Sequence, residues 1–107
     1  AKRRREELSH SRLCTACAKG DFEKVRRLLS ARALDVDHGD VDGRRALHLA
    51  ACGGDERVIE LLLAARADVN VEDHVGNTPL DDALNSDRAD AAALLAKHGG
   101  RHGSQDV

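Results

Sequence analysis

Three side chains near the N-terminus have the types and spacing that could bind a metal ion. His10, Cys14 and Cys17 are separated by four and three residues, so a helix would place all three on one face. Imidazole and thiolate groups are ligands that zinc prefers. Because the sequence shows no evident fourth ligand, a zinc or redox module stands as a remote alternative, and we predict no metal.

A second pair, His48 and Cys52, lies four residues apart in the stretch RRALHLAACGGD. On a helix these two side chains would share a face, as in half of a metal site or a catalytic dyad. Whether they have either role depends on whether the stretch occurs only once in the chain.

The remaining side chains offer little for catalysis. The CGGD sequence is typical of a turn and not of a phosphate-binding loop, and the serines lie in no nucleophile motif. Those serines are Ser9, Ser11, Ser30, Ser86 and Ser104. We therefore predict that the chain is not an enzyme and requires no cofactor.

The basic run KRRR at residues 2–5 could contact nucleic acid or an acidic membrane surface. However, two glutamates follow it at once, Phe22 is the only aromatic residue, and the net charge is −2. We expect a solvated, frayed lead over residues 1–7 and no nucleic-acid binding. We also expect no membrane insertion, because no apolar run approaches the roughly 18 residues of a span.

The composition indicates one small helical domain. The chain has 107 residues, and its 41% apolar share consists largely of alanine and leucine, in runs such as ELLLAARA. Three cysteines, an odd number, do not make a disulfide framework, so we expect an intracellular setting, cytoplasmic or nuclear. Since methionine is absent, we interpret the chain as an excised domain or a processed fragment.

The sequence repeats itself. A shift of 33 residues lays DVDGRRALHLA over DHVGNTPLDDA, so that Gly43 falls on Gly76. A shift of 34 brings the first third of the chain into register, with Asp21 under Asp55. Three units fill the chain, and units this small must stack on one another to bury their apolar faces.

Each unit has the pattern of two short helices joined by a turn. In the middle unit we expect helices at about 46–53 and 56–65, separated by Gly54 in the left-handed conformation that ends a helix. Pro79 lies where a helix of the third unit should begin, and a missing N–H has no cost there.

These units resemble the ankyrin repeat, whose pattern is Asp-x-x-Gly-x-Thr-Pro-Leu-His-x-Ala-Ala, then Gly, Leu-Leu and Ala-Asp-Val-Asn. The middle unit supplies DVDGRRALHLAA, VIELLL and ADVN. The resemblance implies an all-α ankyrin-repeat solenoid of three stacked helix-turn-helix units with turn or hairpin fingers between them. It covers residues 8–100, as repeats at about 8–37, 38–70 and 71–100, and leaves residues 101–107 as a disordered tail.

Several positions depart from the family pattern. Arg45 and Ala46 stand where Thr-Pro is usual, and Arg66 stands where glycine is usual. In the third unit Asp81 replaces the histidine and Asp87 replaces the turn glycine. We interpret the charged first unit as an N-terminal cap and the aspartate-rich third unit as a polar C-terminal cap.

The resemblance also implies roles for the candidate residues. His48 would be structural, with a hydrogen bond across the turn that links repeats, and Cys52 would face the concave side. Cys14 aligns with His48 and Cys17 with Ala51, which are packing positions in the stack.

Ankyrin stacks bind other proteins through a concave surface made by the fingers and the first helices. We predict that a protein partner binds a patch carried over from the family: Lys19, Val41, Asp42, Arg44, Cys52, Gly53, His74, Val75, Asn77, Asn85 and Ser86. Carboxylates concentrate at the connections between units, so we expect a partner with a basic segment.

An alternative keeps the fold and changes the role. The sequence is similar to short ankyrin segments attached to glutaminases, plant-type kinases and potassium channels, which implies a regulatory or self-assembly segment. Residues 1–34 hold ten Lys/Arg against four Asp/Glu, whereas residues 35–107 hold seven against fifteen. This polarity would permit weak head-to-tail self-association.

Overall fold

The computed structural model describes the backbone of residues 2–30, 36–39 and 42–104, and their side chains from Ser11 onward. Within these residues the chain forms six helices and no strand. The helices are α1 (Lys2–Lys19), α2 (Phe22–Leu29), α3 (Ala46–Gly53), α4 (Glu56–Ala64), α5 (Pro79–Asn85) and α6 (Ala89–Lys97).

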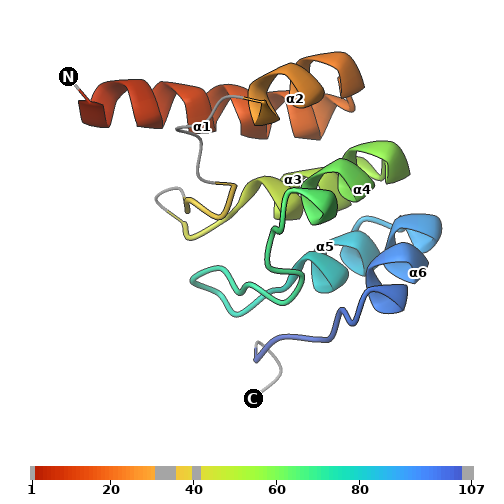
Figure 1. Cartoon of the computed structure of the whole chain (residues 1–107). Coiled ribbons are helices and arrows are strands. Elements are labelled where there is room, and N and C mark those ends of the chain that lie inside the picture. The colour runs from red at the N-terminus through yellow and green to blue at the C-terminus, as the bar shows by residue number, and fades with distance from the viewer. Residues whose placement is uncertain (1, 31–35, 40–41, 105–107) are drawn as a thin grey trace.

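The helices form three antiparallel pairs stacked one upon another (Figure 1). In one layer α3 contacts both α1 and α5, and in a second layer α4 contacts both α2 and α6. The connections that precede α3 and α5 extend to the same side of the stack (Figure 1). The predicted all-α solenoid of three units is confirmed.

Local chemistry sets the helix boundaries. Asp21 and Asp55, which hold equivalent positions in the first two units, each accept hydrogen bonds from backbone N–H groups in the first turn of the following helix. Thr78 has this role before α5, where Pro79 occupies the first turn. Gly54 ends α3 at φ 77°, as predicted.

Two residues without glycine's freedom adopt left-handed backbone conformations. Arg66 has φ 70° and Asp87 has φ 57°. Both stand where the repeat pattern expects a glycine, so the turn geometry persists although the residue type has changed. This conformation costs an L-residue about 1–2 kcal/mol, and aspartate tolerates it better than arginine does.

The core lies between the two layers and is built mainly from small side chains. Leu47, Ala50 and Ala51 of α3 are buried, as are Leu13 and Ala16 of α1. The close approach of these helices depends on small residues. At Gly53, for instance, an added Cβ would lie 2.9 Å from the carbonyl oxygen of Ala18. Small residues such as alanine and glycine therefore fill this core by letting the helices approach closely, whereas other cores are filled by large aromatic side chains.

The structure corrects both terminal predictions. The lead expected to fray over residues 1–7 is helical from Lys2, because α1 runs without interruption into the first unit. The tail expected to be disordered from residue 101 instead lies against the third unit. There the Arg101 N–H donates to Asn70 Oδ1 at 2.7 Å, and Ser104 Oγ donates to Glu72 Oε1 at 2.7 Å. Residues 105–107 lie outside the described residues.

The third unit is also less of a polar cap than predicted. Asp81 and Asp82 were expected to help solvate the end of the stack, but they are only 2% and 5% exposed. Both carboxylates are engaged in interactions that hold neighbouring segments.

Among the described helices, none combines the length and apolar character needed to cross a membrane.

Candidate functional site

Five of the predicted contact residues lie at the C-terminal ends of the first helices. Lys19 ends α1, Cys52 and Gly53 end α3, and Asn85 and Ser86 lie at the end of α5. Lys19, Asn85 and Ser86 are exposed, whereas Cys52 and Gly53 are half-buried. Because α1, α3 and α5 are neighbours in one layer, these residues form a row across the stack, which we call the helix-end row.

Other predicted residues lie on the connections before α3 and α5, the fingers. Asp42, His74 and Val75 are exposed, with Val75 at 71%. The fingers touch each other, because the His74 N–H donates to the Asp42 carbonyl at 2.9 Å. The His74 imidazole packs on Gly43, where a Cβ would lie 2.6 Å from the ring. Val41 lies outside the described residues.

Arg44 joins the second and third units and is not simply a surface residue. One guanidinium nitrogen lies 3.2 Å from Asp73 Oδ2, and the other lies 2.9 Å from Asp82 Oδ2. The second nitrogen also approaches Cys52 Sγ at 3.5 Å. The guanidinium therefore connects a finger carboxylate with a carboxylate on α5.

His48 has the structural role that the family resemblance implies. Its Nδ1 accepts from the Arg45 N–H at 2.9 Å, so the ring proton is on Nε2. Nε2 then donates to the Asn77 carbonyl at 2.9 Å, across the junction between the second and third units. The side chain is 0% exposed, and both of its nitrogens are satisfied.

The two carboxylates beside Arg44 differ in their electrostatics. Burial alone would raise the pKa of Asp73, but the hydrogen bonds from the Asn77 and Val75 N–H groups, together with the nearby Arg44 guanidinium, hold it below the ordinary value. Asp82 has no such backbone donor among the described residues, and burial raises the pKa of its carboxyl despite the attraction of Arg44. The Arg44 guanidinium thus pairs with two buried carboxylates, those of Asp73 and Asp82.

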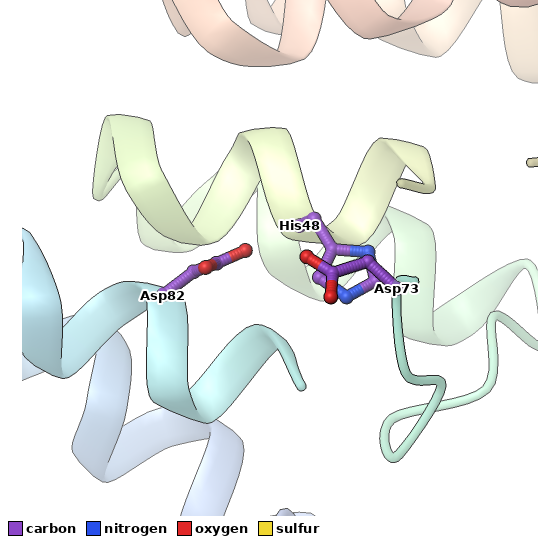
Figure 2. A group of neighbouring side chains, drawn as sticks. All are labelled: His48, Asp73 and Asp82. Carbon is purple, nitrogen blue, oxygen red and sulfur yellow. The ribbon is translucent and has the colours of Figure 1, made fainter. Parts of the chain in front are cut away.

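His48, Asp73 and Asp82 together resemble a metal-binding set, since one ligand atom from each lies within 4.8 Å of the others (Figure 2). The hydrogen bonds favour another interpretation. Both imidazole nitrogens of His48 are engaged with the backbone, and the Arg44 guanidinium bridges the two carboxylates. The cluster is an ion-pair and hydrogen-bond network that joins two units.

The N-terminal metal candidates Cys14 and Cys17 differ in how deeply they are buried. Cys17 is fully buried against α3, and burial, with a smaller effect from Cys14, raises the pKa of its thiol to about 12. A thiol this basic disfavours the thiolate that zinc requires. Cys14 is half-buried, and the side chain of His10 lies outside the described residues. Burial of Cys17 agrees with its predicted packing role.

The acidic character of the fingers is partly structural. Asp37 Oδ1 accepts from the Asp68 N–H at 3.0 Å, Asp68 Oδ1 accepts from the Asn70 N–H at 3.0 Å, and Asp73 is 7% exposed. Asp68 and Asp73 hold local turns, as aspartates in turns commonly do, whereas Asp37 ties two connections that are 31 residues apart in the sequence. Asp42 and Glu72 are the exposed acids on the described parts of the two fingers.

Sequence reasoning missed the contacts of Asp81. Its Oδ2 accepts from the Thr78 N–H at 3.0 Å and from the Gly103 N–H at 2.8 Å, and its Oδ1 lies 2.6 Å from His102 Nδ1. A signal was present in the repeat register. The bond from the Arg101 N–H to Asn70 repeats, one unit later, the bond from the Asp68 N–H to Asp37.

Comparison with known proteins identifies the sequence pattern. Residues 10–106 match the family model described as ankyrin repeats (3 copies). Serine/threonine-protein kinase 12 of Arabidopsis thaliana is 38% identical over 91 residues, which are 85% of this chain and 20% of that protein.

Two further relatives belong to other protein classes. Potassium channel SKOR of Arabidopsis thaliana is 46% identical over 72 residues, which are 67% of this chain and 9% of the channel. The mitochondrial liver isoform of glutaminase from Mus musculus is 37% identical over 84 residues, which are 78% of this chain and 14% of that protein. The chain thus spans about a fifth or less of the length of these relatives.

Proposed function

This chain belongs to the ankyrin-repeat family, and we propose that it binds another protein through its fingers and its helix-end row. Ankyrin repeats are generally protein-interaction modules, and the fold itself is not catalytic. The finger tips and the helix-end row flank the first helices. The eight residues of α3, at 1.5 Å per residue, place about 12 Å between the finger at its N-terminal end and the helix-end row at its C-terminal end.

One observation carries the proposal: the predicted contact residues divide into those that are half-buried and those that are exposed. Arg44 and Gly53 belong to the first group, through ion pairs and close helix packing. Asp42, Val75 and Asn85 belong to the second. We therefore place the binding energy on the exposed group and treat Arg44 and Gly53 as its support.

The chemistry of the exposed finger residues favours a basic segment in the partner. Val75 offers an apolar contact, and the exposed acids Asp42 and Glu72 lie on the same two fingers. Carboxylates around an apolar centre would attract Lys or Arg side chains and speed association, most strongly at low salt.

Selection from a random peptide library tests this proposal. The wild-type chain should enrich peptides that carry Lys or Arg beside an apolar residue, and the double variant Asp42→Arg with Val75→Glu should not retain them. Glu60→Arg is the matched control, because it also reverses an exposed charge but lies on α4 in the other layer.

Circular dichroism should first show that all three proteins are helical to the same extent. If the finger variant retains the enriched peptides as well as the wild type does, or if Glu60→Arg loses them equally, the proposed surface is wrong.

The relatives favour a second candidate, in which the chain is a regulatory or assembly segment of a larger protein. The matched part is a fifth or less of a kinase, a channel and a glutaminase. Light scattering over a range of concentrations and salt separates the two. A module for a separate partner stays at its monomeric 11.5 kDa, whereas an assembly segment gains mass, and loses it again as salt screens the charges.

A further inference from the structure

We propose that a cavity beside Thr78 binds the guanidinium group of an arginine side chain of the partner. The cavity has a volume of about 210 Å³ and is lined by Asn70, Glu72, Thr78, Arg101 and His102. A water molecule occupies about 30 Å³ of liquid, so the cavity has room for a guanidinium group. This inference rests on the proposed function, because it names the chemistry that one part of the binding surface recognises.

The middle unit fills the equivalent space with its own arginine. In the repeat register, Thr78 corresponds to Arg45, Asn70 to Asp37, and Glu72 to Gly39. The Arg45 guanidinium lies against Gly39, within 3.1 Å of where a Cβ would be.

Backbone carbonyls hold this internal arginine. Its Nε donates to the carbonyl of Asp37 at 3.1 Å, and one terminal nitrogen donates to the carbonyls of Gly43 and, at 3.4 Å, Glu72. The repeat thus contains a place where main-chain acceptors surround a planar cation.

In the third unit the side chain is too short to fill this place. Arg45 and Thr78 share one extended backbone conformation, with ψ 168° in both. The hydroxyl of Thr78 instead donates to the Arg101 carbonyl at 2.6 Å. The cavity lies beside Thr78, and its wall includes Asn70 and Glu72, which correspond in the repeat register to Asp37 and Gly39.

The charges around the cavity favour a cation supplied from outside. Glu72 places a carboxylate where the middle unit has Gly39, and within the described residues only its Oε1 accepts a hydrogen bond, from Ser104 Oγ. Among the basic groups of the wall, His102 is paired with the buried Asp81 at 2.6 Å, and the Arg101 side chain is exposed to water. Arginine suits the site better than lysine, because its planar fork of donors can reach several fixed acceptors at once.

Nuclear magnetic resonance of the ¹⁵N-labelled whole chain tests the cavity without the protein partner. N-acetyl-arginine amide should cause saturable shifts of the Asn70, Thr78 and Gly103 amides, and N-acetyl-lysine amide should act several-fold more weakly. Glu72→Gln, a conservative change of an exposed side chain, should weaken the arginine response several-fold with the fold intact.

A second test places a cationic side chain at position 78 of the chain itself, with two matched variants. Thr78→Arg and Thr78→Lys both remove the hydroxyl cap and add a cation, but only arginine carries the Nε and terminal nitrogens with which Arg45 makes its contacts. Thr78→Arg should melt at a higher temperature than Thr78→Lys and should no longer respond to the arginine probe.

Shifts that fail to saturate, equal responses to arginine and lysine, or a saturable response to acetate would each overturn the proposal. Acetate binding would mean that Arg101 makes the cavity an anion site. None of these results would affect peptide binding at Asp42 and Val75, so failure of the cavity is distinguishable from failure of the proposed function.

Discussion

Asp81 holds in the third unit the position that His48 holds in the second, and the two side chains close their units with opposite hydrogen-bonding chemistry. His48 donates from Nε2 to the Asn77 carbonyl at 2.9 Å, whereas Asp81 accepts from the Gly103 N–H at 2.8 Å. An imidazole of this tautomer needs an acceptor on the next segment, and a carboxylate needs donors. The substitution of aspartate for histidine thus matches the segment that follows each unit.

Replacement of His48 by alanine should lower the free energy of unfolding by about 3 kcal/mol. The change leaves a cavity in a fully buried position and unpairs the Arg45 N–H and the Asn77 carbonyl. Urea denaturation measures the effect. The control is His98→Ala at an exposed position, which should change stability by less than about 0.5 kcal/mol. Equal losses in both variants would contradict the structural role of His48.

Arg44→Ala should cost about 2–3 kcal/mol, because it leaves Asp73 and Asp82 buried without their shared cation. This loss is at the lower end for a buried pair, since the Arg44 side chain is 25% exposed. Chemical denaturation of both proteins measures it. Arg26→Ala is the matched control. It breaks an ion pair of similar length, 2.7 Å, whose side chains are 61% and 64% exposed, and it should have little effect.

The two acids beside Arg44 should respond to pH in opposite directions. Asp82 has a folded pKa above its ordinary value of 3.8, so the folded state holds its proton more tightly than the unfolded state does. The stability of the wild type relative to Asp82→Asn should therefore rise as pH falls from 7 toward 4.

Asp73 has a folded pKa below 3.8. The advantage of the wild type over Asp73→Asn should therefore persist down to about pH 4 and disappear as pH falls through the folded pKa. Denaturation midpoints of the three proteins between pH 2 and 7 measure both differences, and parallel curves for the two variants would show that the assignments are wrong.

Gly103→Ala should displace the C-terminal segment from the third unit. An added Cβ would overlap the Gly76 carbonyl oxygen, so the segment must move and lose its bond to Asp81. Amide exchange of residues 101–103 should accelerate, and stability should fall by about 1–2 kcal/mol. Gly99→Ala is the comparison, because its φ of 89° is strained for alanine but no atom lies within 4 Å. Exchange at residues 101–103 should stay slow there.

Cys17 should be the slowest of the three cysteines to alkylate in the native protein. Its pKa of about 12, against an ordinary value of 9.0, lowers the thiolate population about a thousandfold at pH 8, and burial adds a steric barrier. Mass spectrometry after timed iodoacetamide treatment measures the order. In denaturant the three rates should converge, and a fast native reaction at Cys17 would contradict its burial.

The repeat explains why much of this fold could be predicted. Its period placed the two helices of the middle unit almost where α3 and α4 begin and end, and it marked Gly54 as a turn position. The family pattern added that Arg66 stands where a glycine is usual, and the structure gives Arg66 a left-handed φ of 70°.

The site was harder to predict because burial decides which polar residues remain available. The letters DD at 81–82 look like solvated helix surface, yet Asp82 faces Arg44, and Asp81 faces a segment that sequence reasoning had treated as disordered. These contacts join residues that are distant in the sequence, which local patterns do not reveal. Only the repeat register at Arg101 hinted at one of them.

The Arg44 and His48 contacts have a mechanical consequence. Both residues belong to the second unit and hold the third, through Asp73, Asp82 and Asn77. By contrast, the described contacts of the first unit with the second include the packing of α1 on α3, where Leu13 and Ala16 are buried, and the Arg57 guanidinium 5.0 Å from the Phe22 ring centre. In a linear stack, in which each unit is held only by its neighbours, a pulling force or rising denaturant should detach the first unit first. The second and third units would then yield together as one cooperative block.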